Sequence, residues 1–224
     1  MCSAAADFIR ANTAVAAPPL LPELRLHLAT EITPLWQATE AELATGALPP
    51  PYWAFAWAGG QALARHLLDH PALVVGKRVL DFGAGSGLVA IAAATCGAAR
   101  VTAAEIDPFA CAAIALNAAL NGVALAIESR DVLDGAPAAE IILAGDMCYE
   151  RPLAERLARW LRRAAAEGAL VLLGDPGRAY LPKEGLSEIA RYTVPTPLEL
   201  EDRTSRAAVV WRLEPQPLSS ATMR

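Results

Sequence analysis

Two aspartates stand where strands are expected to end, and both could bind a cationic amine. Asp146 follows the predicted strand 140–145, and Asp175 follows the predicted strand 169–173 and Gly174. In an open α/β sheet, ligands bind beyond the carboxyl ends of the strands. Tyr149 lies three residues after Asp146, so a carboxylate and an aromatic ring would form one wall of a slot for a lysine amine. Asp146 and Tyr149 are the candidate catalytic residues. Asp175 begins an Asp-Pro-Gly sequence that is equally typical of a turn.

A glycine-rich segment at residues 79–87 indicates a nucleoside site. It reads Val-Leu-Asp-Phe-Gly-Ala-Gly-Ser-Gly, and Glu105 follows 18 residues after its end. Glycines let the backbone turn tightly under a ligand, and the free N–H groups of the next helix point toward that ligand. A dinucleotide fingerprint has the spacing G-x-G-x-x-G. Here the spacing is G-x-G-x-G with Leu88 next, the form found in class I S-adenosylmethionine (SAM) methyltransferases. The glycines assigned to SAM are Gly83, Gly85 and Gly87.

Three acidic residues are candidates for other parts of SAM. Asp81 could accept a hydrogen bond from the methionine amino group or only steady the loop. Glu105 could accept from the ribose hydroxyls, whereas Asp107, which precedes a proline, is typical of a helix N-cap. Asp131 follows a predicted strand and could accept from the adenine amino group, or it is an exposed loop carboxylate.

An aromatic cluster precedes the first predicted helix of the α/β region. Residues 51–57 read Pro-Tyr-Trp-Ala-Phe-Ala-Trp, with four aromatic residues among the last six. Such a cluster more often belongs to the hydrophobic core than to a ligand site. This one, however, leads into the start of a helix beside the glycine-rich segment, whose residues 83–87 are called the glycine loop below. Trp57 could lie against the adenosine or line a lysine channel through a cation–π contact. Gly60 and Ile106 complete the residues assigned to cofactor binding.

The elements that must position these residues alternate between strand and helix, which predicts a parallel sheet covered on both faces. Two final strands without a helix between them predict a terminal hairpin. The expected fold class is therefore α/β: a Rossmann-like, seven-stranded, mostly parallel sheet with a C-terminal antiparallel hairpin and helices on both faces. Strands are predicted at 78–82, 100–104, 125–129, 140–145, 169–173, 192–194 and 207–213, and helices at 59–70, 87–96, 108–121 and 152–166.

Residues 1–50 are predicted to be an N-terminal extension, and residues 51–224 a SAM-dependent methyltransferase domain. The extension would contain a loose or helical leader, a strand at 24–28 with one face in solvent, and a helix from Thr33-Pro34 to Gly46. The leader lacks the basic start and apolar core of a signal peptide.

The net charge and the spacing of the cysteines limit the kinds of partner and the cellular location that we expect. The net charge of −5 argues against a nucleic-acid substrate, and no apolar run reaches the length of a membrane span. The four cysteines show no C-x-x-C spacing, which indicates reduced thiols in the cytoplasm. His66 and His70 lie four residues apart but are expected on the surface rather than at a metal. No metal site is predicted.

Several segments, in this order, resemble the electron transfer flavoprotein β-subunit lysine methyltransferases, within the seven-β-strand protein lysine methyltransferases. The resemblance covers about residues 21–213. Its segments are Pro22-Glu23-Leu24-Arg25-Leu26, the aromatic cluster with Gly59-Gly60-Gln61, the glycine loop, Gly145-Asp146-Met147 with Tyr149, and Gly174-Asp175-Pro176-Gly177-Arg178.

The resemblance implies an activity and a substrate. Asp146 and Tyr149 match the family's D-x-x-Y segment at the substrate lysine, and the implied reaction converts SAM to S-adenosylhomocysteine. The implied target is a lysine in the recognition loop of the flavoprotein β-subunit. Cys148 departs from the aromatic residue often found there, and Ala58 replaces the usual proline of W-P-G-G.

Three other functions stay open from the residues alone. The acceptor could be a lysine of another protein or a small amine. The chain could be a non-catalytic SAM-binding module, although Asp146 and Tyr149 speak against that. A NAD-dependent oxidoreductase is disfavoured by Leu88 and by the lack of a recognisable hydride-transfer site.

Overall fold

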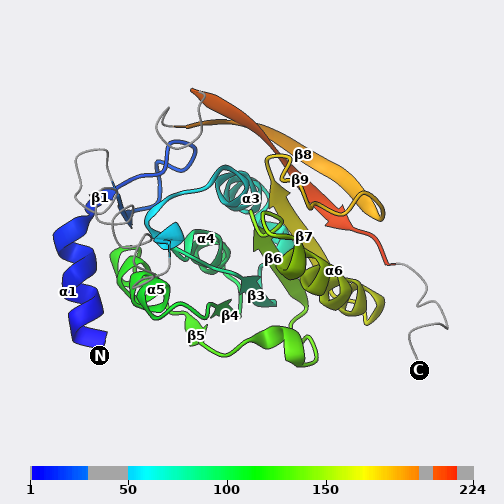
Figure 1. The fold of residues 1–224 in the computed structure, drawn as a ribbon, viewed down its shortest axis with the longest axis horizontal. Helices are drawn as coiled ribbons and strands as arrows, with labels where there is room; N and C mark the ends of the chain where they lie inside the picture. The colour runs from blue at the N-terminus through cyan, green and yellow to red at the C-terminus, as the bar shows by residue number, and fades with distance from the viewer. Residues whose placement is uncertain (1, 30–49, 197–203, 216–224) are drawn as a thin grey trace.

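A computed structural model describes residues 2–29, 50–196 and 204–215 of the chain. Its centre is a seven-stranded sheet with the order β5-β4-β3-β6-β7-β9-β8 (Figure 1). The strands β3 to β7 are parallel, and β9 pairs antiparallel with both β7 and β8. The bounds are β3 (Arg78–Phe82), β4 (Arg100–Ala104), β5 (Ala126–Glu128), β6 (Ile141–Gly145), β7 (Leu170–Asp175), β8 (Leu186–Pro195) and β9 (Ser205–Leu213). The predicted fold class, including the antiparallel hairpin, is confirmed.

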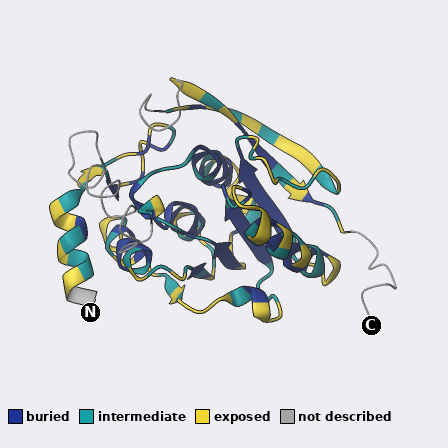
Figure 2. Cartoon of the chain, in the orientation of Figure 1, coloured by how far each residue is buried: buried dark blue, intermediate teal, exposed yellow. Residues whose placement is uncertain are grey.

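Helices cover both faces of the sheet. α3 (Ala58–Asp69), α4 (Leu88–Thr95) and α5 (Pro108–Leu120) lie on one face, and α6 (Arg151–Ala166) lies on the other. Along β6, Ile141 and Leu143 join the cluster under α3 and α4, whereas Ile142 joins the cluster under α6. Successive side chains of a strand point to opposite faces, so a strand buried on both sides must be apolar throughout. Figure 2 shows this buried centre between exposed helix surfaces.

The outermost strand is longer than predicted. β8 covers Leu186–Pro195, whereas the sequence suggested only 192–194. Most of its side chains are exposed or half-buried, because β8 is an edge strand with one neighbour, β9. A strand that buries few side chains lacks the apolar pattern by which strands are recognised.

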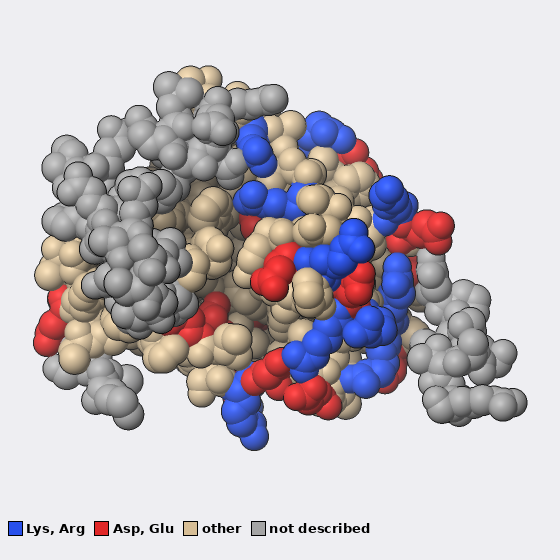
Figure 3. Space-filling model, viewed as in Figure 1, with Lys and Arg blue, Asp and Glu red and all other residues tan. Residues whose placement is uncertain are grey.

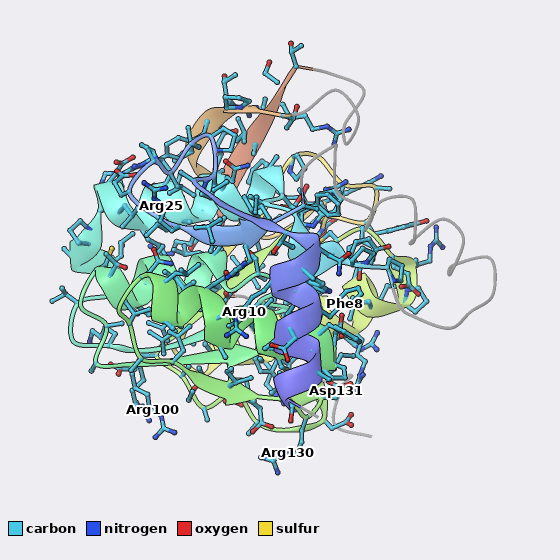
Figure 4. The ribbon with its side chains drawn as sticks, turned by 90° about the vertical axis from the view of Figure 1, so that its left-hand side faces the viewer. Phe8, Arg10, Arg25, Arg100, Arg130 and Asp131 are labelled. Carbon is cyan, nitrogen blue, oxygen red and sulfur yellow. The ribbon has the colours of Figure 1, made fainter. Side chains whose placement is uncertain are left out.

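The described part of residues 1–50 packs onto the same body. α1 (Cys2–Asn12) packs across α5, where the rings of Phe8 and Phe109 are 5.3 Å apart (Figure 4). β1 (Ala14–Ala16) pairs antiparallel with β2 (Leu26–Leu28). Of the two polar residues expected on the solvent-exposed face of this strand, Arg25 is exposed but lies outside β2. The expectation is wrong for His27, which is buried because α5 and the α1–β1 segment cover β2. The predicted helix to Gly46 lies outside the described residues.

Within the described ranges, no helix is long and apolar enough to cross a membrane. The same ranges contain no group of three or more His, Cys, Asp or Glu side chains that could hold a metal. The surface assignment of His66 is wrong, since the side chain is buried under Tyr192 of β8. Its pKa is lowered, chiefly by desolvation and then by His70.

Candidate active site

A cavity of about 490 Å³ lies at the carboxyl ends of β3, β4 and β6. This is the size of a small-molecule site. Eight of the predicted site residues line it: Trp57, Gly83, Gly85, Glu105, Ile106, Asp131, Asp146 and Tyr149. Gly60, Asp81 and Gly87 do not line it, and each instead shapes the backbone around it. The structure therefore brings the predicted cofactor residues and the predicted catalytic pair into one cavity.

At one end of the cavity, backbone N–H groups and a carboxylate meet. Gly83 and Gly85 have φ values of 64° and 52°, in the left-handed region that glycine adopts without steric cost. Glu105 accepts from the backbone N–H of Gly85 at 3.0 Å with Oε2 and from that of Asp107 at 3.0 Å with Oε1. Asp107 is the N-cap of α5 as predicted, accepting from the N–H of Phe109. Glu105 is thus held toward the glycine loop by two backbone donors.

Asp81 lies behind this loop rather than in the cavity. It is 1% exposed, and its Oδ2 accepts from the N–H of Ala90 in the first turn of α4 at 2.9 Å. Desolvation raises its pKa to about 8, against the lowering effect of the Ala90 hydrogen bond. In this structure Asp81 therefore steadies the start of α4, as in the loop-steadying alternative, and does not line the cavity, while its contact with a bound cofactor stays a prediction. Gly87 is likewise a packing position, because a side chain there would meet Ile114 of α5.

Asp131 lines the cavity but has partners within the chain. Its Oδ1 accepts from the N–H of Leu133 at 2.9 Å, and its Oδ2 accepts from Arg156 of α6 at 2.6 Å. The neighbouring Arg130 is paired with Glu128, and Figure 4 shows it at the edge of the molecule, pointing outward. Any ligand that bonds to the Asp131 side chain must share it with Arg156.

At the other end of the cavity, Asp146 is the most constrained of the predicted residues. It is 7% exposed and has a φ of 59°, the only positive φ of a non-glycine residue in the described part of the chain. Its Oδ2 accepts from the N–H of Gly60 at 2.8 Å, and its Oδ1 accepts from Arg178 Nη2 at 2.9 Å. Desolvation raises its pKa and Arg178 partly opposes that rise, so that the pKa is about 6. Strained backbone of this kind persists only where the surroundings enforce it.

Glycines allow α3 to approach Asp146. A side chain at Gly59 would overlap the carbonyl oxygen of Gly174 and would lie 2.6 Å from Asp146 Oδ2, and one at Gly145 would lie 2.8 Å from the Cα of Gly60. The start of α3 therefore crosses directly over the ends of β6 and β7. This contact explains why Gly60 matters although it does not line the cavity: its N–H group reaches the Asp146 carboxylate.

Aromatic rings form the rim beside Asp146. The Tyr52 ring lies 5.5 Å from that of Tyr149 and 6.0 Å from that of Trp57, and Tyr52 and Tyr149 are 48% and 41% exposed. Trp57 is held by a hydrogen bond from its Nε1 to the carbonyl of Tyr52 at 2.8 Å. Trp53 lines the cavity as well but is otherwise buried in the core between α1 and α5, whereas Cys148 is buried under α6, outside the cavity lining.

Two residues that line the cavity, and one that braces the glycine loop behind it, are absent from the residues predicted from sequence. In the sequence Arg178 is only the end of a turn segment, yet it lines the cavity and donates to Asp146. The sequence shows Tyr52 only as one member of an aromatic cluster, and the structure places it in the cavity lining. Asn117 is fully buried in α5, where it donates to the carbonyl of Ser86 in the glycine loop and accepts from the N–H of His27. A single polar residue on the apolar face of an alanine-rich helix was the signal for Asn117.

The residues present fit SAM. One end of the cavity offers the Glu105 carboxylate and the side chain of Ile106, which is 68% exposed and so available to pack on a flat ring. The seven-stranded sheet with its antiparallel hairpin, and a site of this kind at the carboxyl ends of the strands, define a class I SAM-dependent methyltransferase.

The comparisons with known proteins agree. A family model of the ribosomal protein L11 methyltransferase (PrmA) matches residues 64–174. The chain is 40% identical over 217 residues to the electron transfer flavoprotein beta subunit lysine methyltransferase of Xenopus laevis, covering 93% of this chain and 87% of that protein. The mouse protein of the same name is 38% identical to this chain, and the match covers 93% of this chain and 84% of the mouse protein. A crystal structure of a ribosomal protein L11 methylase from Lactobacillus delbrueckii shares the fold, with a TM-score of 0.52 and 23% identity over 72% of this chain and 81% of that one. The chain belongs to the electron transfer flavoprotein beta subunit lysine methyltransferase family.

Proposed function

We propose that this protein methylates lysines of the electron transfer flavoprotein β-subunit, using SAM. The observation that carries the proposal is that Asp146, Tyr149 and Trp57 line the same cavity as the glycine loop and Glu105. An amine-binding wall and a nucleoside site in one cavity support methyl transfer between their ligands. The names of the relatives supply the substrate.

Each of the predicted cofactor residues would contact a different part of SAM. Glu105 would accept from the ribose hydroxyls, Ile106 would pack on the adenine, and the backbone of Gly83 and Gly85 would lie under the methionine part. Asp131 would accept from the adenine amino group only in competition with Arg156. Trp57 contacts Arg178 near Asp146, which favours the lysine channel over the adenosine as its role. When bound, SAM supplies an electrophilic methyl group to the acceptor nitrogen.

Asp146 and Tyr149 would act on the lysine. A lysine side chain has an ordinary pKa of ~10.4, so deprotonation at pH 7.4 costs roughly 4 kcal/mol. Desolvation in a cleft disfavours the charged amine and lowers that cost. Asp146 would bind the ammonium group and hold the nitrogen in place while a proton passes to water, and the rings of Tyr149 and Tyr52 would enclose the side-chain stem. Holding reactants in an attack geometry supplies much of the remaining rate.

The test is transfer of tritiated methyl groups from SAM to purified electron transfer flavoprotein from the same cell. Asp146→Asn is the informative variant, because it keeps the shape and an acceptor for Gly60. We expect label on the β-subunit, a fall of about 100-fold or more in Asp146→Asn, and an unchanged SAM dissociation constant. Asp69→Asn, an ion-paired aspartate on the outer side of α3, is the matched control.

Other outcomes lead to other functions. Label in Asp146→Asn at the wild-type rate would remove Asp146 from the mechanism. SAM binding without label on the flavoprotein would discard this substrate, and labelling of a whole lysate, with separate counting of proteins and small amines, would then identify the acceptor. SAM binding with no labelled product at all would indicate the non-catalytic alternative.

We also propose a cytoplasmic location and no nucleic-acid or membrane partner. The support is the spread of the thiols and the net charge of −5. In Figure 3, Lys and Arg side chains gather on the right of the molecule, where α6 lies in Figure 1. One of the five arginines of α6, Arg156, is paired with Asp131 and Asp134, so these carboxylates offset its positive charge on this side of the molecule.

A further inference from the structure

Arg178 lies between Asp146 and Trp57 at the acceptor end of the cavity. Its Nη2 and Nε donate to Asp146 Oδ1 at 2.9 and 3.2 Å, and its guanidinium carbon lies 5.6 Å from the centre of the Trp57 ring. The side chains of Arg178 and Asp146 are 21% and 9% exposed. An ion pair this far from solvent interacts more strongly than a surface pair, because water screens it less.

The loop after β7 is built to hold Arg178 there. Asp175 Oδ1 accepts from the backbone N–H groups of Gly177 and Arg178, both at 2.7 Å. Gly177 has a φ of 90°, which turns the chain back toward the cavity. Gly174 lies under the start of α3, where a side chain would overlap the carbonyl oxygen of Gly59. Each of these residues of the Gly-Asp-Pro-Gly-Arg segment thus helps to place one guanidinium.

Three donors already occupy the Asp146 carboxylate. Arg178 supplies two N–H groups and Gly60 supplies one. An ionised carboxylate has about four acceptor sites, so roughly one remains for a further donor. That remaining site suits a single N–H of a lysine ammonium group. Arg178 and Gly60 therefore orient the carboxylate and leave one direction open.

The surroundings of Asp146 otherwise disfavour its charge. Burial and, to a smaller extent, the nearby Asp175 raise the pKa of the carboxyl group, Arg178 and the Gly60 N–H lower it, and the result of these opposing effects is a pKa of about 6. Asp175 itself has a raised pKa because of burial. The adjacent Cys148 thiol is neutral at physiological pH, since burial raises its pKa to about 12. Burial also raises the pKa of Tyr149. Of the side chains named here, Arg178 is the cation that opposes protonation of Asp146.

We propose that Arg178 is a positioning residue for methyl transfer: its guanidinium keeps the Asp146 carboxylate ionised and aimed at the acceptor lysine. The inference rests on the proposed function for the identity of the acceptor. Without Arg178, Asp146 becomes protonated near neutral pH and loses its attraction for a cationic lysine. The effect on catalysis is therefore a pH-dependent one.

The kinetic test compares Arg178→Gln with wild type from pH 6 to pH 9, counting label on the flavoprotein alone. We expect kcat/KM to fall about tenfold or more at pH 7, and the ratio of wild type to variant to shrink as the pH rises, because Asp146 then ionises without help. Deprotonation of the substrate lysine affects both enzymes equally and cancels in the ratio. Arg178→Lys, which keeps the charge, should show a ratio that varies little with pH. Arg191→Gln, which removes an arginine paired with Glu188 on β8, is the control.

A second measurement needs no substrate. The carbon-13 signal of the Asp146 carboxyl group, assigned by its absence in Asp146→Asn, is titrated in both proteins. We expect a midpoint about one to three pH units higher in Arg178→Gln. An unchanged midpoint, a pH-independent activity ratio, or a higher kcat/KM in the variant would overturn the proposal; the last would mean that Arg178 competes with the lysine. If wild type leaves the flavoprotein unlabelled, the substrate is wrong, and the titration still decides the role of Arg178.

Discussion

The two ends of the cavity are built in different ways. At the cofactor end, Glu105 is held by the backbone N–H groups of Gly85 and Asp107, which lie within 20 residues of it along the chain. At the acceptor end, Asp146 is held by Gly60 and Arg178, which lie 86 and 32 residues away. The first end is made mostly of local backbone, and the second of a network of distant side chains and interlocking glycines.

This difference separates two tasks. Backbone donors present the same groups whatever the side chains are, and this suits a ligand that does not vary. Side chains brought together from separate elements can be exchanged one at a time, and this suits recognition of a particular acceptor. We therefore expect substitutions at the acceptor end to disturb a network, and those at the cofactor end to have local effects.

The largest expected effect tests the interlock at the acceptor end. Gly59→Ala should lower the free energy of unfolding by about 3 kcal/mol or more, because the added methyl group overlaps the backbone of Gly174, which cannot retreat from the sheet. Gly85→Ala at the cofactor end should cost only about 1–2 kcal/mol, the strain of a positive φ, since its nearest neighbour lies at 3.9 Å. Urea unfolding without SAM measures both.

Gly60→Ala is the control for Gly59→Ala. It is the next residue of the same helix, and an added methyl group would meet only Val89, at 3.9 Å. The change should alter the unfolding free energy by about 1 kcal/mol or less. A larger loss for Gly85→Ala than for Gly59→Ala would reverse the comparison between the two ends.

A middle-sized effect tests the cofactor end. Glu105→Gln should weaken SAM binding about tenfold, since an amide presents one acceptor oxygen where the carboxylate presents two, and a hydrogen bond to a charged group is stronger than one to a neutral group. Isothermal titration calorimetry measures the dissociation constant. The maximal rate at saturating SAM should stay within a few-fold of wild type. If that rate fell as far as in Asp146→Asn, Glu105 would belong to both ends.

The smallest effect at neutral pH concerns Asp81. Its pKa of about 8 means that it is mostly protonated in the folded protein at pH 7, so Asp81→Asn, which keeps the shape of the neutral group, should leave the SAM dissociation constant at that pH almost unchanged. A carboxyl group whose pKa is raised in the folded protein binds more protons than the unfolded chain does, and stability falls as the pH rises from about 4 to about 8. Urea unfolding at pH 5 and pH 8 should therefore show a larger fall for wild type than for Asp81→Asn. Equal falls would mean that Asp81 is ionised throughout.

Much of the cofactor end could be predicted from the sequence because its parts are local. The spacing of Gly83 and Gly85, the distance to Glu105, and the Asp107 cap each depend on a strand, a turn and the next helix. Asp81 shows the limit of that reasoning. The sequence places it beside the glycines but cannot say that its side chain turns inward to Ala90. The long edge strand β8 was underestimated for a related reason, since its exposed side chains carry no apolar pattern.

The sequence by itself determined the order of strands and helices, the class of nucleoside site, and the positions of Asp146 and Tyr149 after a strand, because each follows from hydrophobic periodicity and local turn chemistry. Only the tertiary structure decided what surrounds Asp146. Gly60, Arg178 and Trp57 meet it because α3 crosses the ends of β6 and β7 and the loop after β7 folds back. Contacts between residues far apart in the chain depend on how whole elements pack, and no local pattern records that.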